Sequence, residues 1–203
     1  MVHQVEGIRR IRLGSLEPRI VTETFAEELA KMEKICPHFH LSLQSGCDAT
    51  LARMNRKYTT EEYENACNIL RKNFTHPAIT TDVIVGFPGE TEEEFAQTKE
   101  YLKRIHFYEM HIFKYSRRQG TRAAVMEHQV PEEIKEARLS QLMALQAGIS
   151  RELNERRVGS ECRVLVTGFD GMLYTGRSEM EAPDSDGSIL FTAPRELTPG
   201  EFV

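Results

Sequence analysis

The sequence lacks the features that mark membrane proteins, secreted precursors and wholly basic proteins. No run of apolar residues is long enough to span a bilayer, and no signal-peptide pattern opens the chain. Positive charge is not in excess, since 26 Lys and Arg stand against 31 Asp and Glu, a formal net charge of −5 at pH 7. This balance excludes a protein whose whole surface grips nucleic acid, although a local basic groove stays compatible with it.

Cysteine is scarce and widely spaced. No two of the four cysteines have the C-x-x-C spacing, the residues being Cys36, Cys47, Cys67 and Cys162. The pattern excludes the disulfide framework of a small secreted domain and predicts reduced thiols in a cytoplasmic protein. The cysteines alone therefore give no metal site. Internal repeats are also absent, and 203 residues suffice for one sizeable domain with a smaller companion.

Strand-like and helix-like segments alternate up to about residue 157. The expected strands are 8–13, 38–43, 79–85 and 109–115. The expected helices are 23–34, 49–54, 61–73, one opened by Thr91, and a long one from Pro131 to about Arg156. Thr and Glu at capping-box spacing mark three helix starts, at 24/27, 59/62 and 91/94. This alternation predicts parallel β/α units, either as an open sheet or as a barrel.

The alternation of strand-like and helix-like segments ends near Gly159. Short strands are expected at 162–167, 173–178 and 189–192, separated by the turn sequences FDG and DSDG. This pattern predicts an all-β module, most simply a small barrel. We therefore expect two domains, residues 1–157 and residues 158–203, with the second one truncated.

Polar and apolar residues alternate along two of the expected strands. A strand places alternate side chains on opposite faces, so one face of each strand is apolar and the other polar. If the apolar faces meet the helices, the polar faces line the inside of the sheet, which predicts a wet or ligand-filled cavity. The alternative is that these polar side chains are simply solvated. The polar set is Arg10, Arg12, His38, His40, Ser42 and Gln44, opposite Ile11, Leu13, Phe39, Leu41 and Leu43.

Two of these histidines invite a zinc interpretation. His38 and His40 share a face, and Cys36 precedes them. Imidazole and thiolate are zinc ligands, but no further ligand pair is evident in the sequence. We therefore expect histidines that line a lumen and no metal site.

Gln44, Arg56 and Asp82 form the constellation with the clearest binding chemistry. Gln44 ends one strand, Arg56 follows it, and Asp82 lies inside the next apolar strand. A carboxylate and an amide can bind a ribose diol, and an arginine fork can hold a carboxylate. That strand feeds the glycine-rich turn GFPGE, and ligands bind at the carboxyl ends of parallel strands. The alternative is a structural ion pair between Arg56 and Asp82.

Three motifs resemble those of the radical S-adenosylmethionine methylthiotransferases. They are LSLQSGCDATLARMNRKYT, TTDVIVGFPGETEEEF and HIFKYSRRQGTRAA, and the similarity covers nearly the whole chain. The resemblance implies an α/β fold: the carboxyl-terminal part of an incomplete (β/α)6 TIM-like barrel, followed by a small all-β, OB-like TRAM barrel. It also implies S-adenosylmethionine as cofactor. The implied cofactor-binding residues are Gln44, Arg56, Asp82, Gly86, Pro88, Gly89, Phe113, Tyr115 and Ser116.

The sequence departs from the family in its cysteines. Family members hold a catalytic [4Fe–4S] cluster with a Cys-x3-Cys-x2-Cys loop and a second cluster in an amino-terminal domain, and neither motif is present. We therefore expect a carboxyl-terminal fragment that carries no catalytic residue, is inactive alone, and self-associates through the exposed barrel edge.

The resemblance leaves two substrate branches open. RMNRKYT resembles the branch that modifies adenosine beside the tRNA anticodon, particularly the enzymes acting on threonylcarbamoyladenosine. We predict tRNA as the partner, with phosphate contacts from Arg53, Lys57, Lys114, Arg117, Arg118 and Arg122.

The carboxyl-terminal module indicates the other branch, which modifies an aspartate of a small-subunit ribosomal protein. From Arg157 onward, four arginines stand against eight acids, a poor surface for phosphate, and GRSEMEAPDSDG resembles the TRAM segment of that branch. This is our alternative prediction. A third reading is a non-catalytic interaction module that kept the barrel and lost its cluster.

Overall fold

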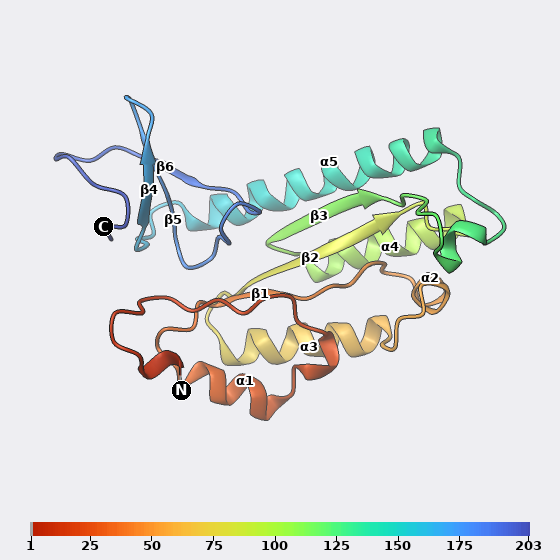
Figure 1. The fold of residues 1–203 in the computed structure, drawn as a ribbon, viewed down its shortest axis with the longest axis horizontal. Coiled ribbons are helices and arrows are strands. Elements are labelled where there is room, and N and C mark those ends of the chain that lie inside the picture. Colours follow the sequence, from red (N-terminus) through yellow and green to blue (C-terminus); the bar gives the residue numbers. More distant parts are fainter. Residues whose placement is uncertain (1) are drawn as a thin grey trace.

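Three parallel strands form the centre of the computed structural model, which describes residues 2–203 (Figure 1). The strands lie side by side in the order β1 (His38–His40), β2 (Ala78–Val85) and β3 (Glu109–Lys114). Isolated parallel bridges widen this sheet: Ile11 pairs with Ile35, Leu16 with Leu41, and Gln44 with Val83. The parallel β/α arrangement is confirmed. The predicted strand at 8–13 is wrong as a regular strand, because the segment makes only the Ile11 bridge there.

Among residues 2–203, five α-helices connect and cover the strands. They are α1 (Glu23–Ala30), α2 (Asp48–Arg53), α3 (Thr60–Asn73), α4 (Glu92–Ile105) and α5 (Glu132–Arg157), with short 3-10 turns η1 (Val2–Gln4), η2 (Pro18–Ile20) and η3 (Arg122–Val125). The capping boxes that open α3 and α4 are confirmed. The box at Thr24 is wrong, since Thr22 caps α1 by accepting the Phe25 N–H. Within residues 2–203, no helix is long and apolar enough to cross a membrane.

The apolar face of the β1 strand packs against the helices, as predicted. Phe39, Leu41 and Leu43 are fully buried in the main core. Tyr63 of α3 donates a hydrogen bond to the Leu41 carbonyl at 2.8 Å, which fixes the helix against the strand. His40 lies on the opposite face and is only partly buried. The sheet therefore has an apolar helix-covered face and a polar lumen face.

Residues 158–203 form a separate antiparallel sheet. Its strands are β4 (Leu165–Phe169), β5 (Tyr174–Arg177) and β6 (Ile189–Phe191), in that order, and Phe202 bridges back to Leu165. A small core of Val166, Tyr174 and Leu197 lies beneath them. The all-β module is confirmed. The division after Arg157, where α5 ends, stays a proposal.

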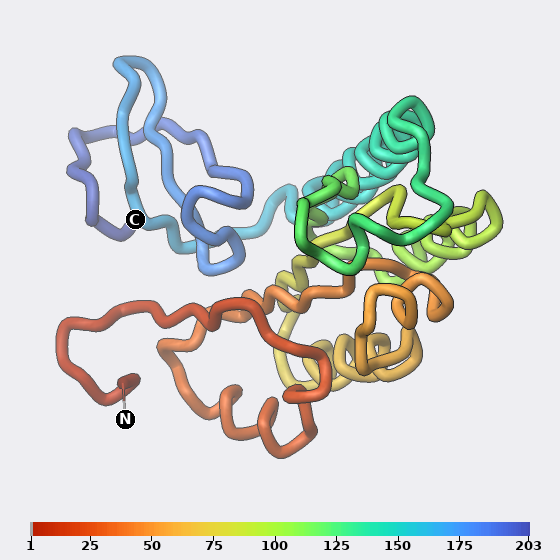
Figure 2. Tube along the Cα trace, turned by 45° about the vertical axis from the view of Figure 1, so that its right-hand side comes forward, coloured from red at the N-terminus to blue at the C-terminus, as the bar shows by residue number. Residues whose placement is uncertain are grey.

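The antiparallel module lies toward the amino ends of the parallel strands, whose arrows point away from it in Figure 1, and Figure 2 shows the module at the upper left of the tube. Arg12 donates to the carbonyls of Ser178 and Glu179 at 2.9 and 2.6 Å. Arg10 donates to the carbonyls of Arg163 and Arg177 at 2.7 and 3.1 Å. Both arginines thus bind the segment around Ile11 to the antiparallel module, and this segment forms no regular strand in the parallel sheet. The predicted self-association through this edge of the sheet stays a prediction.

Asp186 of the antiparallel module binds histidines on the lumen face of the parallel sheet. Its side chain is 1% exposed and accepts hydrogen bonds from His38 Nε2 at 2.8 Å and from the Ala182 N–H at 2.8 Å. His111 Nε2 lies 3.3 Å from its other oxygen. Burial works to raise the pKa of Asp186, but the hydrogen bonds from His38 and Ala182 and the nearby histidine charges lower it to about 2.

We expect Asp186→Asn to lower the free energy of unfolding by about 2 kcal/mol at pH 7. The folded-state pKa lies below the ordinary value of 3.8, so this contribution is present above that value and is lost as the pH falls toward about 2. Denaturant titrations at pH 7 and near pH 3 measure the difference. Asp184→Asn, an exposed change in the same loop, is the control. Equal losses for the two variants would contradict the role given to Asp186.

Candidate functional site

The predicted cofactor residues Gln44, Asp82, Phe113 and Tyr115 gather along neighbouring strands at the carboxyl edge of the parallel sheet. The Gln44 N–H donates to the Asp82 carbonyl at 2.8 Å, and the Ile84 N–H donates to the Gln44 carbonyl at 2.9 Å. Phe113 of β3 pairs in register with Ile84, and the Tyr115 N–H donates to the Val85 carbonyl at 2.8 Å. The structure thus brings these four residues onto adjacent positions of the edge.

The glycine-rich turn after β2 is held rigidly. Gly86 has φ +72°, and a Cβ there would lie 2.3 Å from Cγ of Lys135. Its N–H donates to Glu90 Oε2 at 2.6 Å, and Arg138 of α5 donates to the same oxygen at 2.7 Å. Gly89, at φ +79°, donates its N–H to the His128 carbonyl at 2.9 Å. Left-handed backbone and close approach to α5 explain why glycine stands at Gly86.

Arg56 and Ser116 are exposed at the same edge. The Tyr58 hydroxyl ties the Arg56 loop to the strand that carries Gln44, since it donates to the Ser42 carbonyl at 2.7 Å. The alternative of an Arg56–Asp82 ion pair is wrong, because the carboxylate of Asp82 has other partners.

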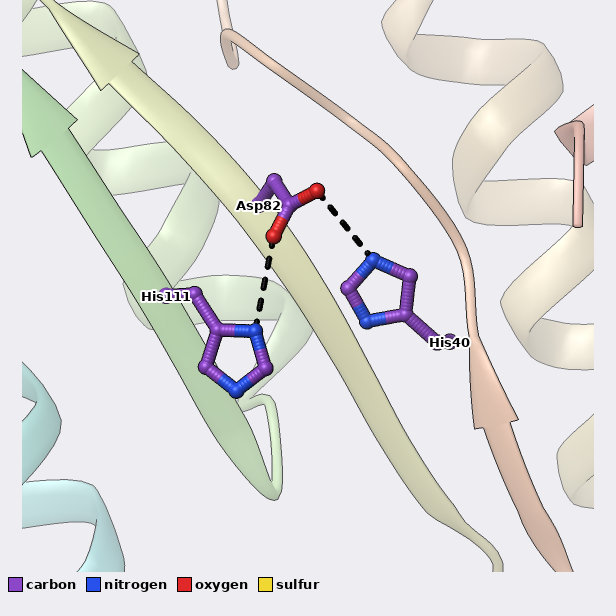
Figure 3. A group of neighbouring side chains, drawn as sticks. All are labelled: His40, Asp82 and His111. Atoms are coloured by element: carbon purple, nitrogen blue, oxygen red, sulfur yellow. Dashed lines mark ion pairs between the residues drawn. The ribbon is translucent and has the colours of Figure 1, made fainter. Parts of the chain in front are cut away.

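Those partners are two histidines (Figure 3). Asp82 Oδ2 lies 3.3 Å from His40 Nε2, and Asp82 Oδ1 lies 3.4 Å from His111 Nδ1. The two rings are nearly parallel, at 16°, with centroids 5.6 Å apart. The contact with His40, followed by the charges of both histidines, lowers the pKa of Asp82 although burial opposes this. Sequence reasoning missed His111, which the register of β2 and β3 places opposite Asp82.

The edge residues fit a nucleoside cofactor such as S-adenosylmethionine. The Tyr115 hydroxyl is buried without a hydrogen-bond partner among the described residues, and its ring contacts Phe87 of the glycine-rich turn and Lys135 of α5. Phe113 is 52% exposed on the lumen face and offers an aromatic surface for a base. Gln44, Asp82 and Arg56 would hold the ribose and carboxylate groups, and the bound cofactor would supply the radical chemistry.

The cysteines do not fit a [4Fe–4S] cluster. Cys36, Cys47 and Cys67 are buried in the domain core, whereas Cys162 is exposed in the other module. Burial raises the pKa of Cys36 and raises that of Cys67 to about 12, which disfavours the thiolate form that ligates iron. No step of a reaction is therefore assigned to a cluster held by these residues.

Two of the predicted phosphate contacts have carboxylate partners instead. Arg53 forms a two-point ion pair with Glu94 of α4, one contact being 2.9 Å. Lys114 lies 2.7 Å from Glu132 and 2.6 Å from Glu136 of α5. These partners neutralise both cations, so the structure does not present them as free charges. The other predicted contacts are exposed: Lys57, Arg117, Arg118 and Arg122.

A cavity at the other end of the sheet contains none of these residues. It measures about 1300 Å³ and opens between the amino end of the sheet, the end of α5 and the antiparallel module. Its lining includes Arg71, Lys103, Arg157 and Arg163 but no predicted cofactor residue. This cavity is therefore separate from the candidate cofactor edge.

Two family models match separate parts of the chain, one in the parallel β/α domain and one in the antiparallel module. Residues 2–102 match the radical SAM superfamily, and residues 158–203 match the TRAM domain. The chain is also similar in fold to coproporphyrinogen III oxidase (HemN) from Escherichia coli, a radical SAM enzyme. That match has a TM-score of 0.57 and 19% identity, and it covers 69% of this chain and 32% of HemN. The predicted fold class, a partial radical SAM α/β domain followed by a small antiparallel TRAM domain, is confirmed.

Curated relatives match between 87% and 100% of the chain. Ribosomal protein uS12 methylthiotransferase RimO of Clostridium botulinum (strain Loch Maree) is 38% identical over 202 residues, which is 100% of this chain and 45% of the relative. The RimO of Clostridium perfringens (strain ATCC 13124) is 41% identical over 186 residues, 92% of this chain and 42% of the relative. The tRNA-2-methylthio-N(6)-dimethylallyladenosine synthase of Acetivibrio thermocellus is 42% identical over 180 residues, 87% of this chain and 38% of the relative. The chain thus spans less than half the length of these relatives.

Proposed function

The chain belongs to the radical SAM methylthiotransferase family. From this premise we propose that it is part of an enzyme that adds a methylthio group to a ribosomal protein. Membership implies S-adenosylmethionine and [4Fe–4S] clusters in the whole enzymes of the family. In this proposal the chain contributes one side of the cofactor pocket and the TRAM domain. It contributes no cluster ligand and is inactive alone.

The observation that carries the substrate proposal is the acidic surface of the TRAM domain, part of which (Glu161 and Glu179) lines the cavity at the amino end of the sheet. Glu181 and Asp186 are buried against the parallel sheet and do not contribute to that surface, and Glu201 is paired with Arg195. The remaining acids are exposed without an ion-pair partner in the described structure: Glu161, Asp170, Glu179, Asp184 and Glu196. Such a surface attracts a basic partner and repels phosphate. Ribosomal protein uS12, which the RimO relatives modify by name, is our proposed partner, with an aspartate side chain as the modified group.

A second candidate is adenosine beside the tRNA anticodon. This is our first prediction from the sequence, but most of the relatives described above support the alternative, the ribosomal protein. The Acetivibrio relative, at 42% identity, is a tRNA enzyme by name, and the tRNA candidate replaces the ribosomal-protein proposal only if RNA proves the better ligand. Exposed arginines at the carboxyl edge, Arg117, Arg118 and Arg122, could contact phosphate there.

We expect the chain to bind uS12 more tightly than an anticodon stem-loop, in titrations at low salt. Glu161→Lys combined with Glu179→Lys should weaken uS12 binding roughly tenfold, because two attractive charges become repulsive. Glu127→Lys, an exposed acid outside the TRAM domain, is the matched control. Tighter binding of the stem-loop, weakened by Arg117→Ala with Arg118→Ala, would support the tRNA candidate instead.

A further inference from the structure

Three side chains on the lumen face form a cluster that the proposed function does not explain. His40, Asp82 and His111 come from three adjacent strands, and one potential ligand atom from each lies within 4.8 Å of the others (Figure 3). Their side chains are 14%, 29% and 22% exposed, so the cluster is ordered by its surroundings but accessible from the lumen.

Each ring nitrogen of His111 faces a carboxylate oxygen, one of Asp82 and one of Asp186. Nε2 faces Asp186, a buried and ionised carboxylate that can only accept, at 3.3 Å. With its one proton on Nε2, facing Asp186, a neutral His111 has a lone pair on Nδ1. That lone pair faces Asp82 Oδ1 at 3.4 Å. Two lone pairs in this position repel each other unless a second proton or a cation lies between them.

The distances suit a cation better than a proton. A charge-assisted hydrogen bond between nitrogen and carboxylate is about 2.7–2.9 Å long. The two contacts to Asp82 are 3.3 and 3.4 Å. Ligand atoms at about 2.0–2.1 Å from a tetrahedral Zn²⁺ lie about 3.3–3.4 Å from one another. The two contacts to the Asp82 carboxylate are thus close to the edges of a metal coordination shell, and all three potential ligand atoms lie within 4.8 Å of one another.

Each histidine also has a partner behind it. His40 Nδ1 lies 3.0 Å from the Thr80 hydroxyl, and His111 Nε2 faces Asp186. Metal-ligating histidines are typically held in this way, by a hydrogen bond from the nitrogen that does not bind the metal.

We propose that His40 Nε2, His111 Nδ1 and the Asp82 carboxylate bind one divalent first-row transition ion, represented by Zn²⁺, with a further coordination position open to the lumen. Two imidazoles and one carboxylate are a common ligand set for such ions. The ion joins β1, β2 and β3 on the face that no helix covers. The site goes beyond the proposed function: Asp82 is also the predicted ribose contact, so metal and cofactor are alternative ligands of this carboxylate.

The test is a Co²⁺ titration of the tag-free chain in a Cys162→Ser background, because the exposed thiol of Cys162 binds Co²⁺ as well. We expect one Co²⁺ per chain, visible d–d absorption bands without thiolate charge transfer, and displacement by Zn²⁺. His40→Asn, Asp82→Asn and His111→Asn should each weaken binding at least about 100-fold, and Asp186→Asn about tenfold. His76→Asn, an exposed histidine outside the cluster, should bind normally.

Circular dichroism of each variant shows whether it is folded, so that loss of binding is not confused with unfolding. A chain that binds no Co²⁺, or one whose three ligand variants bind as well as His76→Asn does, overturns the proposal. Because the probe is the metal alone, neither result depends on the methylthiotransferase proposal.

Discussion

Replacing Arg138 with methionine should lower the free energy of unfolding by about 3–5 kcal/mol. Arg138 and Glu90 have side chains only 5% and 1% exposed, and their contact is 2.7 Å. Burial already raises the pKa of Glu90, against the opposing effects of the Gly86 N–H and Arg138. Without the guanidinium, a buried carboxylate loses its counter-charge while still bonded to the turn after β2. Denaturant unfolding at pH 7 measures the loss.

Two controls separate this effect from a general loss of charge. Arg104→Met breaks an exposed pair with Glu64, whose side chains are 61% and 33% exposed, and should cost less than about 1 kcal/mol. Glu90→Gln in the Arg138→Met background removes the buried charge but keeps an acceptor for the Gly86 N–H, and should restore part of the stability. A loss for Arg138→Met no larger than that for Arg104→Met would show that the buried pair does not hold the turn.

The second large effect is expected for Gly86→Ala, at about 2–4 kcal/mol of unfolding free energy. The change adds a side chain to a left-handed backbone, φ +72°, and places its Cβ 2.3 Å from Cγ of Lys135, so α5 must move. Backbone strain of about 1 kcal/mol and overpacking of about 1–3 kcal/mol combine. Thermal and denaturant unfolding measure the loss.

Gly120→Ala is the matched control for this prediction. Gly120 has a similar φ, +82°, but a Cβ there meets nothing within 4 Å. It should show the backbone strain alone. Equal losses at the two positions would mean that the contact of the turn with α5 does not limit stability.

Local patterns in the sequence predicted the elements and the faces of the sheet. The capping boxes at Thr59 and Thr91 and the alternation around Phe39 depend only on neighbours in the chain, so they could be read directly. The motifs around Gln44 and Asp82 predicted a family and a shared edge of the sheet. The edge is observed, whereas binding of the cofactor by these residues remains a prediction.

Contacts between distant segments could not be read in this way. The pairing of Asp82 with His111 depends on strand register, and that of Arg53 with Glu94 depends on how α4 packs beside α2. Asp186 counted as a surface acid in the sequence, but docking of the TRAM domain buries it against His38. Arg53 was therefore predicted to contact phosphate but pairs with Glu94, and Asp186 was counted as a surface acid but is buried.

The measurement that tests the account most directly uses the whole protein that contains this chain. It is reconstituted anaerobically with iron and sulfide, reduced, and incubated with S-adenosylmethionine and with both unmodified uS12 and unmodified tRNA. Mass spectrometry then locates the added methylthio group. The account predicts the addition on the ribosomal protein, and its loss when Gln44 is replaced by alanine. Addition to tRNA alone, or to neither substrate, would contradict it.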